Sequence, residues 1–290
     1  LKKNENLKKV LFLIVSKSGN TIETLSNTFA LKILKKNAKN IIIISEKSNN
    51  TLFSLSKKLN LFYIKHNKFV GGRYSVFSET GIIPAYLMGI NITKFRSKTF
   101  SFLAGNRKSF LKESSLILTE LLLSKKLSNL IFLNYSPQLE QFLFWCQQLI
   151  AESLGKQGKG FLPFISNVPK DHHSLLQLYL DGPKDKFFYI FSCAEDSKNK
   201  ISIQKGVKIC NFLNKKKLSS IKTAQKKALI KTLVENKIPY REFKIKKINE
   251  EALGELFSYF MLETVISAKL AKINRYDQPA VEQVTLFTKS

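Results

Sequence analysis

The sequence is poor in the residues that build metal centres and disulfide scaffolds. Its three cysteines, Cys146, Cys193 and Cys210, lie far apart and form no CxxC pair, and there are only three histidines. We therefore expect no metal site and no disulfide framework, and thiols of this kind favour a reducing, cytoplasmic location. No apolar run approaches the roughly 18 residues of a membrane span, and no secretory leader is visible, so we expect no membrane partner.

Acidic residues are also scarce: 48 Lys and Arg face 21 Asp and Glu, which gives a net charge of +27. Such a charge is typical of proteins that bind nucleic acids or other anionic partners. The lysines are scattered over the whole chain, however, without an Arg-rich helix or an aromatic RNA-binding signature. We expect no nucleic-acid partner, and small anionic substrates are the simpler consequence of the charge. A steep loss of binding affinity with added salt would indicate the nucleic-acid alternative.

The chain of 290 residues is long enough for a large core and two domains. Residue 1 is leucine and the first apolar run begins by residue 10, so we expect a natural N-terminal segment before it. Apolar runs alternate with helical patterns, which predicts an α/β fold with doubly wound parallel sheets. The two domains are expected at residues 1–100 and 101–290.

The individual elements follow from the same patterns. In the first half we expect strands over 10–15, 41–45 and 61–65, and helices after residue 22, over 51–59 and over 81–89. Residues 93–129 are predicted to be a linker with a helix over 110–123. In the second half we expect strands over 129–135, 187–191 and 241–246. Helices are expected there over 139–152, 175–182, 203–213, 222–236 and 250–273, and after residue 279.

A hydroxyl-rich turn, Ser16-Lys-Ser-Gly-Asn-Thr, joins the first predicted strand to the first predicted helix. Backbone N–H groups and the positive end of the helix dipole face such a turn, and its hydroxyl groups add hydrogen-bond donors. The pattern predicts a phosphate site at residues 16–21, at the carboxyl edge of the sheet. The alternative is that Ser18 or Asn20 only caps the helix.

Three further features have the residue types that proton-transfer chemistry needs. Val70-Gly-Gly-Arg73 presents a guanidinium beside a flexible backbone, although a tight turn with a solvated arginine is the alternative. Glu152 lies near the end of a predicted helix, where the dipole disfavours the charged carboxylate; it is a candidate general base or a partly exposed helix-end glutamate. His173 starts the next helix and is either a proton donor or a helix cap.

Five motifs occur in a fixed order along the chain: Ser16-Lys-Ser-Gly-Asn-Thr-Ile-Glu-Thr24, Val70-Gly-Gly-Arg-Tyr-Ser75, Ala151-Glu-Ser153 with Gly155-Lys156, His173-Ser with Gln177, and Tyr276-Asp-Gln-Pro279 with Val281-Glu282. Across residues 10–285, this order resembles the glucose-6-phosphate isomerase (phosphoglucose isomerase) family in its compact bacterial form. The resemblance implies two sugar isomerase (SIS) domains, the first incomplete, in a homodimer with a shared active site and no cofactor. It also implies interconversion of glucose 6-phosphate and fructose 6-phosphate in glycolysis and gluconeogenesis, by C1/C2 proton transfer through an enediol intermediate.

The resemblance assigns roles residue by residue. The family's phosphate-binding hydroxyls match Ser16, Ser18 and Thr21, with Lys17 and Thr24 in the same loop. Arg73 matches the arginine that stabilises the enediolate, and Glu152 matches the base that moves the proton. His173 matches a histidine that the neighbouring subunit contributes to ring opening, and Gln278 matches a substrate-contacting glutamine.

The chain departs from the family pattern in three places. The family's glycine-rich loop, which supplies another phosphate-binding serine, is not found upstream of residue 16. The family lysine seven residues after Gln278 is Thr285 here, and Lys289 follows one helical turn later. His172 stands where the family usually has glutamine. The alternative function is a non-catalytic sugar-phosphate-binding SIS module or an inactive isomerase fragment, but such a module has no need for all three catalytic matches.

Overall fold

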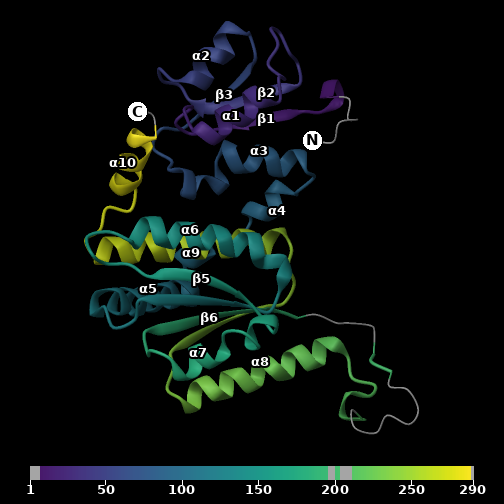
Figure 1. The fold of residues 1–290 in the computed structure, drawn as a ribbon, viewed down its shortest axis with the longest axis vertical. Helices are drawn as coiled ribbons and strands as arrows, with labels where there is room; N and C mark the ends of the chain where they lie inside the picture. The colour runs from purple at the N-terminus through teal and green to yellow at the C-terminus, as the bar shows by residue number, and fades with distance from the viewer. Residues whose placement is uncertain (1–6, 195–199, 203–210, 289–290) are drawn as a thin grey trace. The chain divides into compact units, whose positions relative to one another are not determined.

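The computed structural model describes residues 7–194, 200–202 and 211–288. The chain divides into two compact units, residues 1–96 and 97–290. Each unit holds one sheet whose paired strands are all parallel (Figure 1). The predicted α/β class with two parallel sheets is therefore confirmed.

The first unit contains three strands in sequential order. They are β1 (Phe12–Val15), β2 (Ile41–Glu46) and β3 (Phe62–His66), connected by α1 (Ile22–Ala30) and α2 (Thr51–Lys58). Crossovers of one hand between strands in sequential order place both helices on one face of the sheet. The buried side chains of Ile14, Ile41 and Ile43 pack on that face with Leu52 of α2. The turn at residues 16–21 thus follows β1 at the carboxyl edge.

The first unit continues beyond its sheet with short helices. These are the 3₁₀ helix η2 (Gly72–Phe77), α3 (Glu79–Leu87) and α4 (Ile92–Arg96). Helix α3 begins two residues earlier than predicted, so Pro84 lies inside the helix rather than near its start. The early start places Glu79 at the first helical position, where a carboxylate faces the positive end of the helix dipole.

The second unit contains four strands in the order β5-β4-β6-β7. The strands are β4 (Asn129–Asn134), β5 (Leu162–Asn167), β6 (Lys186–Cys193) and β7 (Tyr240–Ile245). The helices are α5 (Gly105–Ser124), α6 (Glu140–Leu154), α7 (Leu176–Asp181), α8 (Leu218–Glu235), α9 (Glu250–Leu270) and α10 (Pro279–Phe287). From β4 the chain first adds β5 on one side, and then returns to add β6 and β7 on the other side. The direction in which strands are added therefore reverses between β4 and β6.

Helices cover both faces of the second sheet. On one face, α7 and α8 pack on alternate residues of the central strands, with Leu229 and Leu233 of α8 against Ile131 and Ile190. On the other face lie α6 and α9 (Figure 1), where Phe191 stacks on Phe243 with ring centroids 4.6 Å apart. No helix in the described part of the chain is both long enough and apolar enough to cross a membrane.

Two sequence-based expectations for the second unit were wrong, and one lies outside the described residues. Strand β5 was not predicted. Residues 93–129 are not a linker, since α5 fills most of them and packs on α9, where Ser267 Oγ donates to the Ser115 carbonyl at 3.2 Å. Of the helix expected over 203–213, only the 3₁₀ turn Asn211–Leu213 is described.

Candidate active site

The turn at residues 16–21 has a left-handed backbone that favours glycine at its centre. Gly19 has a φ of +66°, and a Cβ atom there would lie 1.9 Å from Asn50 Oδ1. The Gly19 N–H donates to the Ser16 carbonyl at 3.1 Å, which folds the turn back on the end of β1. The Gly19 carbonyl accepts from Leu52 N at 3.1 Å, so the turn is also fixed against α2.

The start of α1 has no side-chain cap. Thr21 occupies the N-cap position without capping the helix, and its Oγ1 lies 2.7 Å from Ser16 Oγ instead. Asn20 Oδ1 accepts from the N–H and hydroxyl of Thr51 at 2.9 and 2.8 Å, and Ser18 Oγ accepts from Asn20 N at 3.2 Å. The alternative that Ser18 or Asn20 caps α1 is therefore wrong. The uncapped first N–H groups of α1 and the hydroxyl groups of this polar turn form an arrangement suited to an anion.

Lys17 and Thr24 lie beside this turn. Lys17 Nζ is 3.5 Å from Glu46 Oε1 at the end of β2, and its side chain is 36% exposed, so the ammonium is only loosely held. Thr24 is in the first turn of α1, and its carbonyl accepts from Thr28 Oγ1 at 2.6 Å. The cation is thus placed at the same edge of the sheet as the turn.

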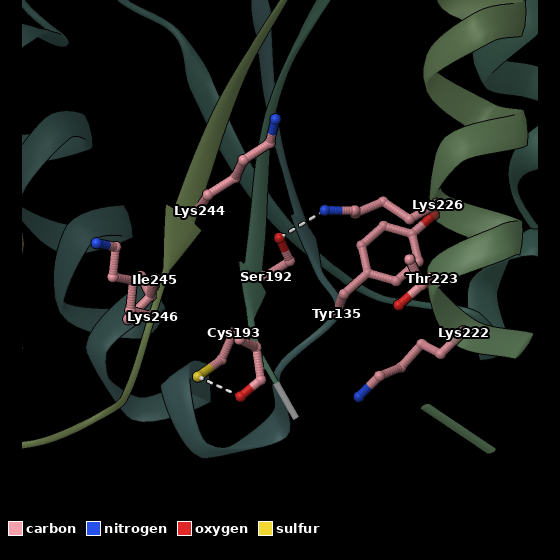
Figure 2. A pocket seen from close by; sticks show the side chains of 10 residues that line it. Tyr135, Ser192, Cys193, Lys222, Thr223, Lys226, Lys244, Ile245 and Lys246 are labelled. Carbon is pink, nitrogen blue, oxygen red and sulfur yellow. Dashed lines mark hydrogen bonds between the residues drawn. The ribbon is translucent and has the colours of Figure 1, made fainter. Parts of the chain in front are cut away.

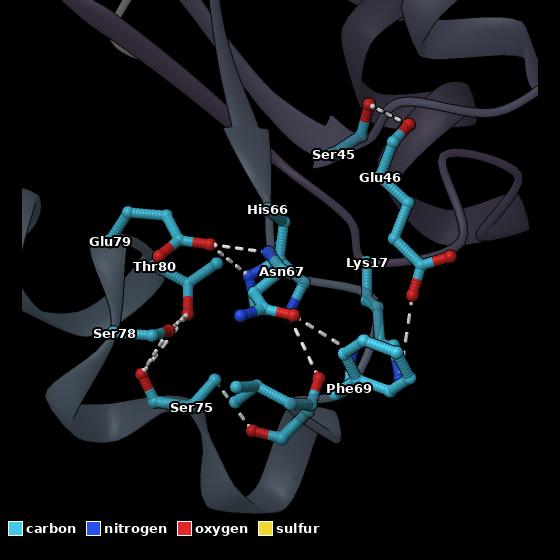
Figure 3. Close-up of polar contacts among 12 residues, drawn as sticks. Lys17, Ser45, Glu46, His66, Asn67, Phe69, Ser75, Ser78, Glu79 and Thr80 are labelled. Carbon is cyan, nitrogen blue, oxygen red and sulfur yellow. Dashed lines mark hydrogen bonds and ion pairs between the residues drawn. The ribbon is translucent and has the colours of Figure 1, made fainter.

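A buried histidine joins the start of α3 to the loop that carries Arg73; we call the contacts of His66 with Glu79 and Val70 the histidine clamp. His66, at the end of β3, is 1% exposed. Its Nδ1 lies 2.6 Å from Glu79 Oε1, and its Nε2 lies 3.0 Å from the Val70 carbonyl (Figure 3). Glu79 Oε1 also accepts from Asn67 N at 2.9 Å. Both ring nitrogens face acceptors, so both contacts are hydrogen bonds only when each nitrogen carries a proton.

Arg73 lies in η2, between the clamp and α3, and is buried. Its guanidinium carbon is 5.5 Å from the centre of the Tyr74 ring. Neither Gly71 nor Gly72 has a positive φ, and a Cβ atom at Gly72 would meet nothing within 4 Å. The backbone therefore does not require glycine at either position. The alternative of a tight turn with a solvated arginine does not fit, because the turn needs no glycine and Arg73 is buried. Ser75 Oγ donates to the Gly72 carbonyl at 2.6 Å and tightens the loop around the arginine.

Because Glu79 takes part in the clamp, the difference in stability between the wild type and a Glu79→Gln variant should depend on pH. Burial raises the pKa of Glu79, but hydrogen bonds from its own backbone N–H, Asn67 and His66, together with the His66 charge, lower the pKa below its ordinary value. A carboxyl with a depressed folded-state pKa stabilises the fold above its unfolded pKa of about 4.3, and this contribution is lost as the pH falls through the folded pKa. We expect Glu79→Gln to reduce the free energy of unfolding by about 1–3 kcal/mol near neutral pH.

Urea unfolding of the wild type and Glu79→Gln at about pH 6.5 and about pH 3.5 measures this difference. The difference should shrink at the lower pH. Glu23→Gln, which removes an exposed carboxylate of the same unit, is the control. An equal difference at both pH values would show that the Glu79 charge does not contribute.

In the second unit, Glu152 lies near the end of α6 and is joined to a residue far along the chain. Gln278 Nε2 donates to Glu152 Oε2 at 2.9 Å, and Gln148 Nε2 donates to Glu152 Oε1 at 3.0 Å. The structure thus brings together two sequence-predicted site residues that are 126 positions apart. An amide on each carboxylate oxygen fixes the orientation of the candidate base.

Lys156 organises the loop before Gln278, a role that sequence reasoning missed. Its Nζ donates to the Asn274 carbonyl at 2.5 Å, the Asp277 carbonyl at 2.6 Å and Asp277 Oδ1 at 2.7 Å. The hydrogen bond and charge of Lys156 lower the pKa of Asp277, against a small opposing effect of burial. The only sequence signal for this role was the Gly-Lys pair directly after the Glu152 motif.

His173 lies at the opposite edge of the second sheet from Glu152. It follows the carboxyl end of β5 and is exposed, whereas α6 delivers Glu152 to the amino end of the same strand. Six residues of β5 at about 3.3 Å each separate the two edges by roughly 16–20 Å. The structure therefore does not bring His173 and Glu152 together within one chain.

The neighbouring His172 contacts the hydroxyl group of Tyr135. Its Nε2 lies 3.0 Å from the Tyr135 hydroxyl. Burial and the nearby His173 lower the pKa of His172, and Asp171 offsets this in part. Residue 285 belongs to α10, and Lys289 lies outside the described residues. Among the described residues, no group of three or more His, Cys, Asp or Glu side chains is arranged to hold a metal ion.

The chain matches known proteins over almost its whole length. The family model described as phosphoglucose isomerase matches residues 1–289. A probable glucose-6-phosphate isomerase of Methanococcus maripaludis is 34% identical over 287 residues, which cover 96% of this chain and 65% of the relative. The glucose-6-phosphate isomerase of Methanocaldococcus jannaschii is 33% identical over 293 residues, which cover 97% and 71%. The chain therefore spans only part of the length of each relative.

Solved structures share the fold. A hypothetical protein from Thermus thermophilus aligns with a TM-score of 0.86 at 25% identity and covers 99% of this chain and 72% of that chain. A glucose-6-phosphate isomerase from Chlamydia trachomatis aligns with a TM-score of 0.75 at 17% identity, covering 99% and 60%, which concerns the fold alone. The match of the family model and the sequence identity to the archaeal relatives confirm the resemblance found in the motifs: this chain belongs to the phosphoglucose isomerase family.

Proposed function

We propose that this chain interconverts glucose 6-phosphate and fructose 6-phosphate. In this reaction a base removes the C2 proton of the open-chain aldose, an enediolate forms between C1 and C2, and a proton is returned at C1 while the C2 oxygen becomes the carbonyl. The family and the names of its relatives support this reaction. The structural observation that carries the proposal is the uncapped, hydroxyl-lined start of α1.

The turn at residues 16–21 anchors the part of the substrate that does not react. The hydroxyl groups of Ser16, Ser18 and Thr21 and the N-terminus of α1 bind the phosphate group, and Lys17 and Thr24 complete the loop. A dianion held at one end positions the sugar carbons without interfering with proton transfer. Binding energy from the remote phosphate thereby contributes to orienting the reacting carbons.

The chemical step belongs to Glu152 and Arg73. Glu152 accepts the proton from one carbon and returns it to the next, and Gln278 contacts both this carboxylate and the substrate. Arg73 stabilises the negative charge that develops on the enediolate oxygen. The two amide hydrogen bonds on Glu152 support this assignment, because a proton shuttle needs a fixed orientation rather than a mobile exposed carboxylate.

His173 assists ring opening in a second copy of the chain. The separation of His173 and Glu152 at opposite edges of one sheet supports this assignment, since the two side chains need different chains to meet. A two-fold symmetric homodimer is the simplest such assembly, and each chain then supplies one histidine. We place this dimer in the cytoplasm, which the free thiols of Cys146 and Cys193 support.

The non-catalytic alternative uses only part of this arrangement. A sugar-phosphate-binding module or an inactive isomerase fragment needs the turn at residues 16–21. It has no use for an arginine in a loop that a buried histidine holds or for a glutamate oriented by two glutamines. No feature of the described residues favours this alternative over the isomerase.

The anchor is tested by the double variant Ser18→Ala/Thr21→Ala. Each lost hydrogen bond to a charged phosphate costs about 1.5–3 kcal/mol, so the loss of two is expected to raise KM for the hexose phosphates about 10²–10⁴-fold. Ser26→Ala, one turn further along α1 and exposed, is the matched control and should leave KM unchanged. An unchanged KM in the double variant would show that the phosphate binds elsewhere.

A further inference from the structure

A cavity lies at the carboxyl edge of the second sheet, where the strand order reverses between β4 and β6. It has a volume of 410 Å³ and is lined by residues from the ends of β4, β6 and β7 and from α8 (Figure 2). Open α/β sheets bind ligands at such a reversal point. None of the residues to which we assign a role in the isomerisation is among those that line it.

Half-buried lysines continue the sheet-facing side of α8 beside this cavity. Leu229 and Leu233 of α8 pack on the sheet, and Lys222 and Lys226 lie seven residues before them, on the same face of the helix. The Lys226 side chain is only 14% exposed. A lysine in a position that leucine would fill loses hydration, which costs free energy unless its charge is paired or used.

Among the described residues, the positive charge at the cavity exceeds the negative charge beside it. Lys226 Nζ is 2.6 Å from Glu242 Oε1, and Lys244 Nζ is 3.0 Å from Glu242 Oε2. One carboxylate therefore serves two ammonium groups; burial raises the pKa of Glu242, but the hydrogen bonds and charges of these two lysines lower it overall. Lys246 adds a further ammonium group to the lining, and Lys222, which makes an interaction of its own, lines the cavity as well. The cavity is thus suited to an anion.

A serine hydroxyl among the lysines gives the cavity a directional donor. Ser192 is paired with Lys244 in the β6–β7 register and points to the same face of the sheet. Its Oγ accepts from Lys226 Nζ at 2.8 Å, so its own proton is available to donate. The Thr223 hydroxyl also lines the cavity but donates its proton to the Ser219 carbonyl at 2.8 Å, and the Tyr135 ring forms an aromatic wall (Figure 2).

We propose that this cavity is a second anion site, which binds a phosphate monoester of metabolite size. Ammonium groups with a hydroxyl donor match a compact dianion, for which lysine acts as a point charge. The volume of 410 Å³ lies within the range of about 300–1,000 Å³ typical of small-molecule sites. The proposal goes beyond the isomerase function, because it does not depend on residues 16–21.

The test is a titration of the full chain with inorganic phosphate, followed through the backbone amide signals of Ser192 and Thr223 by NMR. The titration is done in the Ser18→Ala/Thr21→Ala background at constant ionic strength, so that the first site does not contribute. We expect saturable shifts, and a dissociation constant that rises at least about tenfold in Lys222→Gln/Lys246→Gln. Lys227→Gln/Lys247→Gln removes the same charge from neighbouring lysines that do not line the cavity, and should leave the constant unchanged.

Three outcomes would overturn the proposal. They are shifts that do not saturate, equal weakening in both lysine pairs, and equal displacement by chloride, which indicates non-specific screening. If Lys222→Gln/Lys246→Gln does not fold, Lys246→Gln alone is compared with Lys247→Gln under the same criteria. The phosphate titration does not depend on isomerase activity. The KM effect at residues 16–21 does not depend on this cavity, so the two proposals fail independently.

Discussion

Replacement of Glu152 by glutamine is expected to lower kcat about 10²–10⁴-fold while KM for the hexose phosphates changes little. Glutamine has almost the same shape, and its side-chain oxygen still accepts the hydrogen bond that Gln278 donates to Glu152 at 2.9 Å. It does not accept a carbon-bound proton, however. The substitution therefore removes an interaction that is made only in the transition state and leaves phosphate anchoring intact.

Steady-state kinetics in both directions of the reaction measures this effect. Glu113→Gln removes an exposed carboxylate from α5 of the same unit and serves as the matched control. Gln278→Ala should lower kcat by a smaller factor, because it frees the orientation of Glu152 without removing the base. A Glu152→Gln enzyme with near wild-type kcat would assign proton transfer to another residue, and a rise in KM alone would assign Glu152 to binding.

Two of the strands that sequence analysis found are central strands whose apolar composition predicts their burial. Strand β2 begins with four consecutive isoleucines, and β6 contains Phe187-Phe-Tyr-Ile-Phe191. Both strands lie inside a sheet, between two neighbours, and both are largely buried. A central parallel strand needs apolar side chains on both faces, so the pattern and the structure agree there.

Strand β5 was missed because it contains a proline, which an edge strand tolerates. It contains Pro163, which has no N–H for a sheet and counts against a strand in sequence analysis. In the order β5-β4-β6-β7, however, β5 has only one neighbouring strand. The Pro163 carbonyl accepts from Gln147 Nε2 of α6 at 2.8 Å instead of from a further strand. Only the strand order reveals that proline is tolerated at this position.

The helix expected over 110–123 is confirmed as part of α5, but its segment was taken for a linker because part of its buried face is polar in sequence. Ser114, Ser115 and Thr119 are buried, and each hydroxyl donates to a carbonyl three or four residues earlier, at 2.6–3.0 Å. These internal hydrogen bonds satisfy the hydroxyl groups without solvent or a partner element. Composition alone therefore indicated a solvated segment, whereas the structure shows a helix packed on α9.

The candidate site was predictable only where its parts are close in sequence. The hydroxyl turn before α1 is local, and strand, turn and helix follow one another directly. The clamp of His66 and Glu79 and the hydrogen bond of Gln278 to Glu152 join residues 13 and 126 positions apart. No periodicity encodes such pairs, because they depend on how loops return to the ends of strands and helices.

The last prediction tests the placement of His173 in a second chain. Glu152→Gln and His173→Ala chains are co-expressed with different tags, and the mixed dimer is purified through both tags. If His173 acts across the dimer, one of its two sites combines an intact Glu152 with an intact His173, and activity should be about half that of the wild-type dimer. Each homodimer of a single variant should remain strongly impaired, since every site lacks one acid–base group.

The reciprocal dimer distinguishes the two arrangements. It pairs a wild-type chain with a chain that carries both Glu152→Gln and His173→Ala. When His173 crosses to the partner, each site of this dimer lacks one of the two groups, and the dimer should be nearly inactive. When both groups act within one chain, this dimer keeps about half the activity and the first mixed dimer has none. The roughly 16–20 Å along β5 between the two edges of the sheet predicts the crossed pattern.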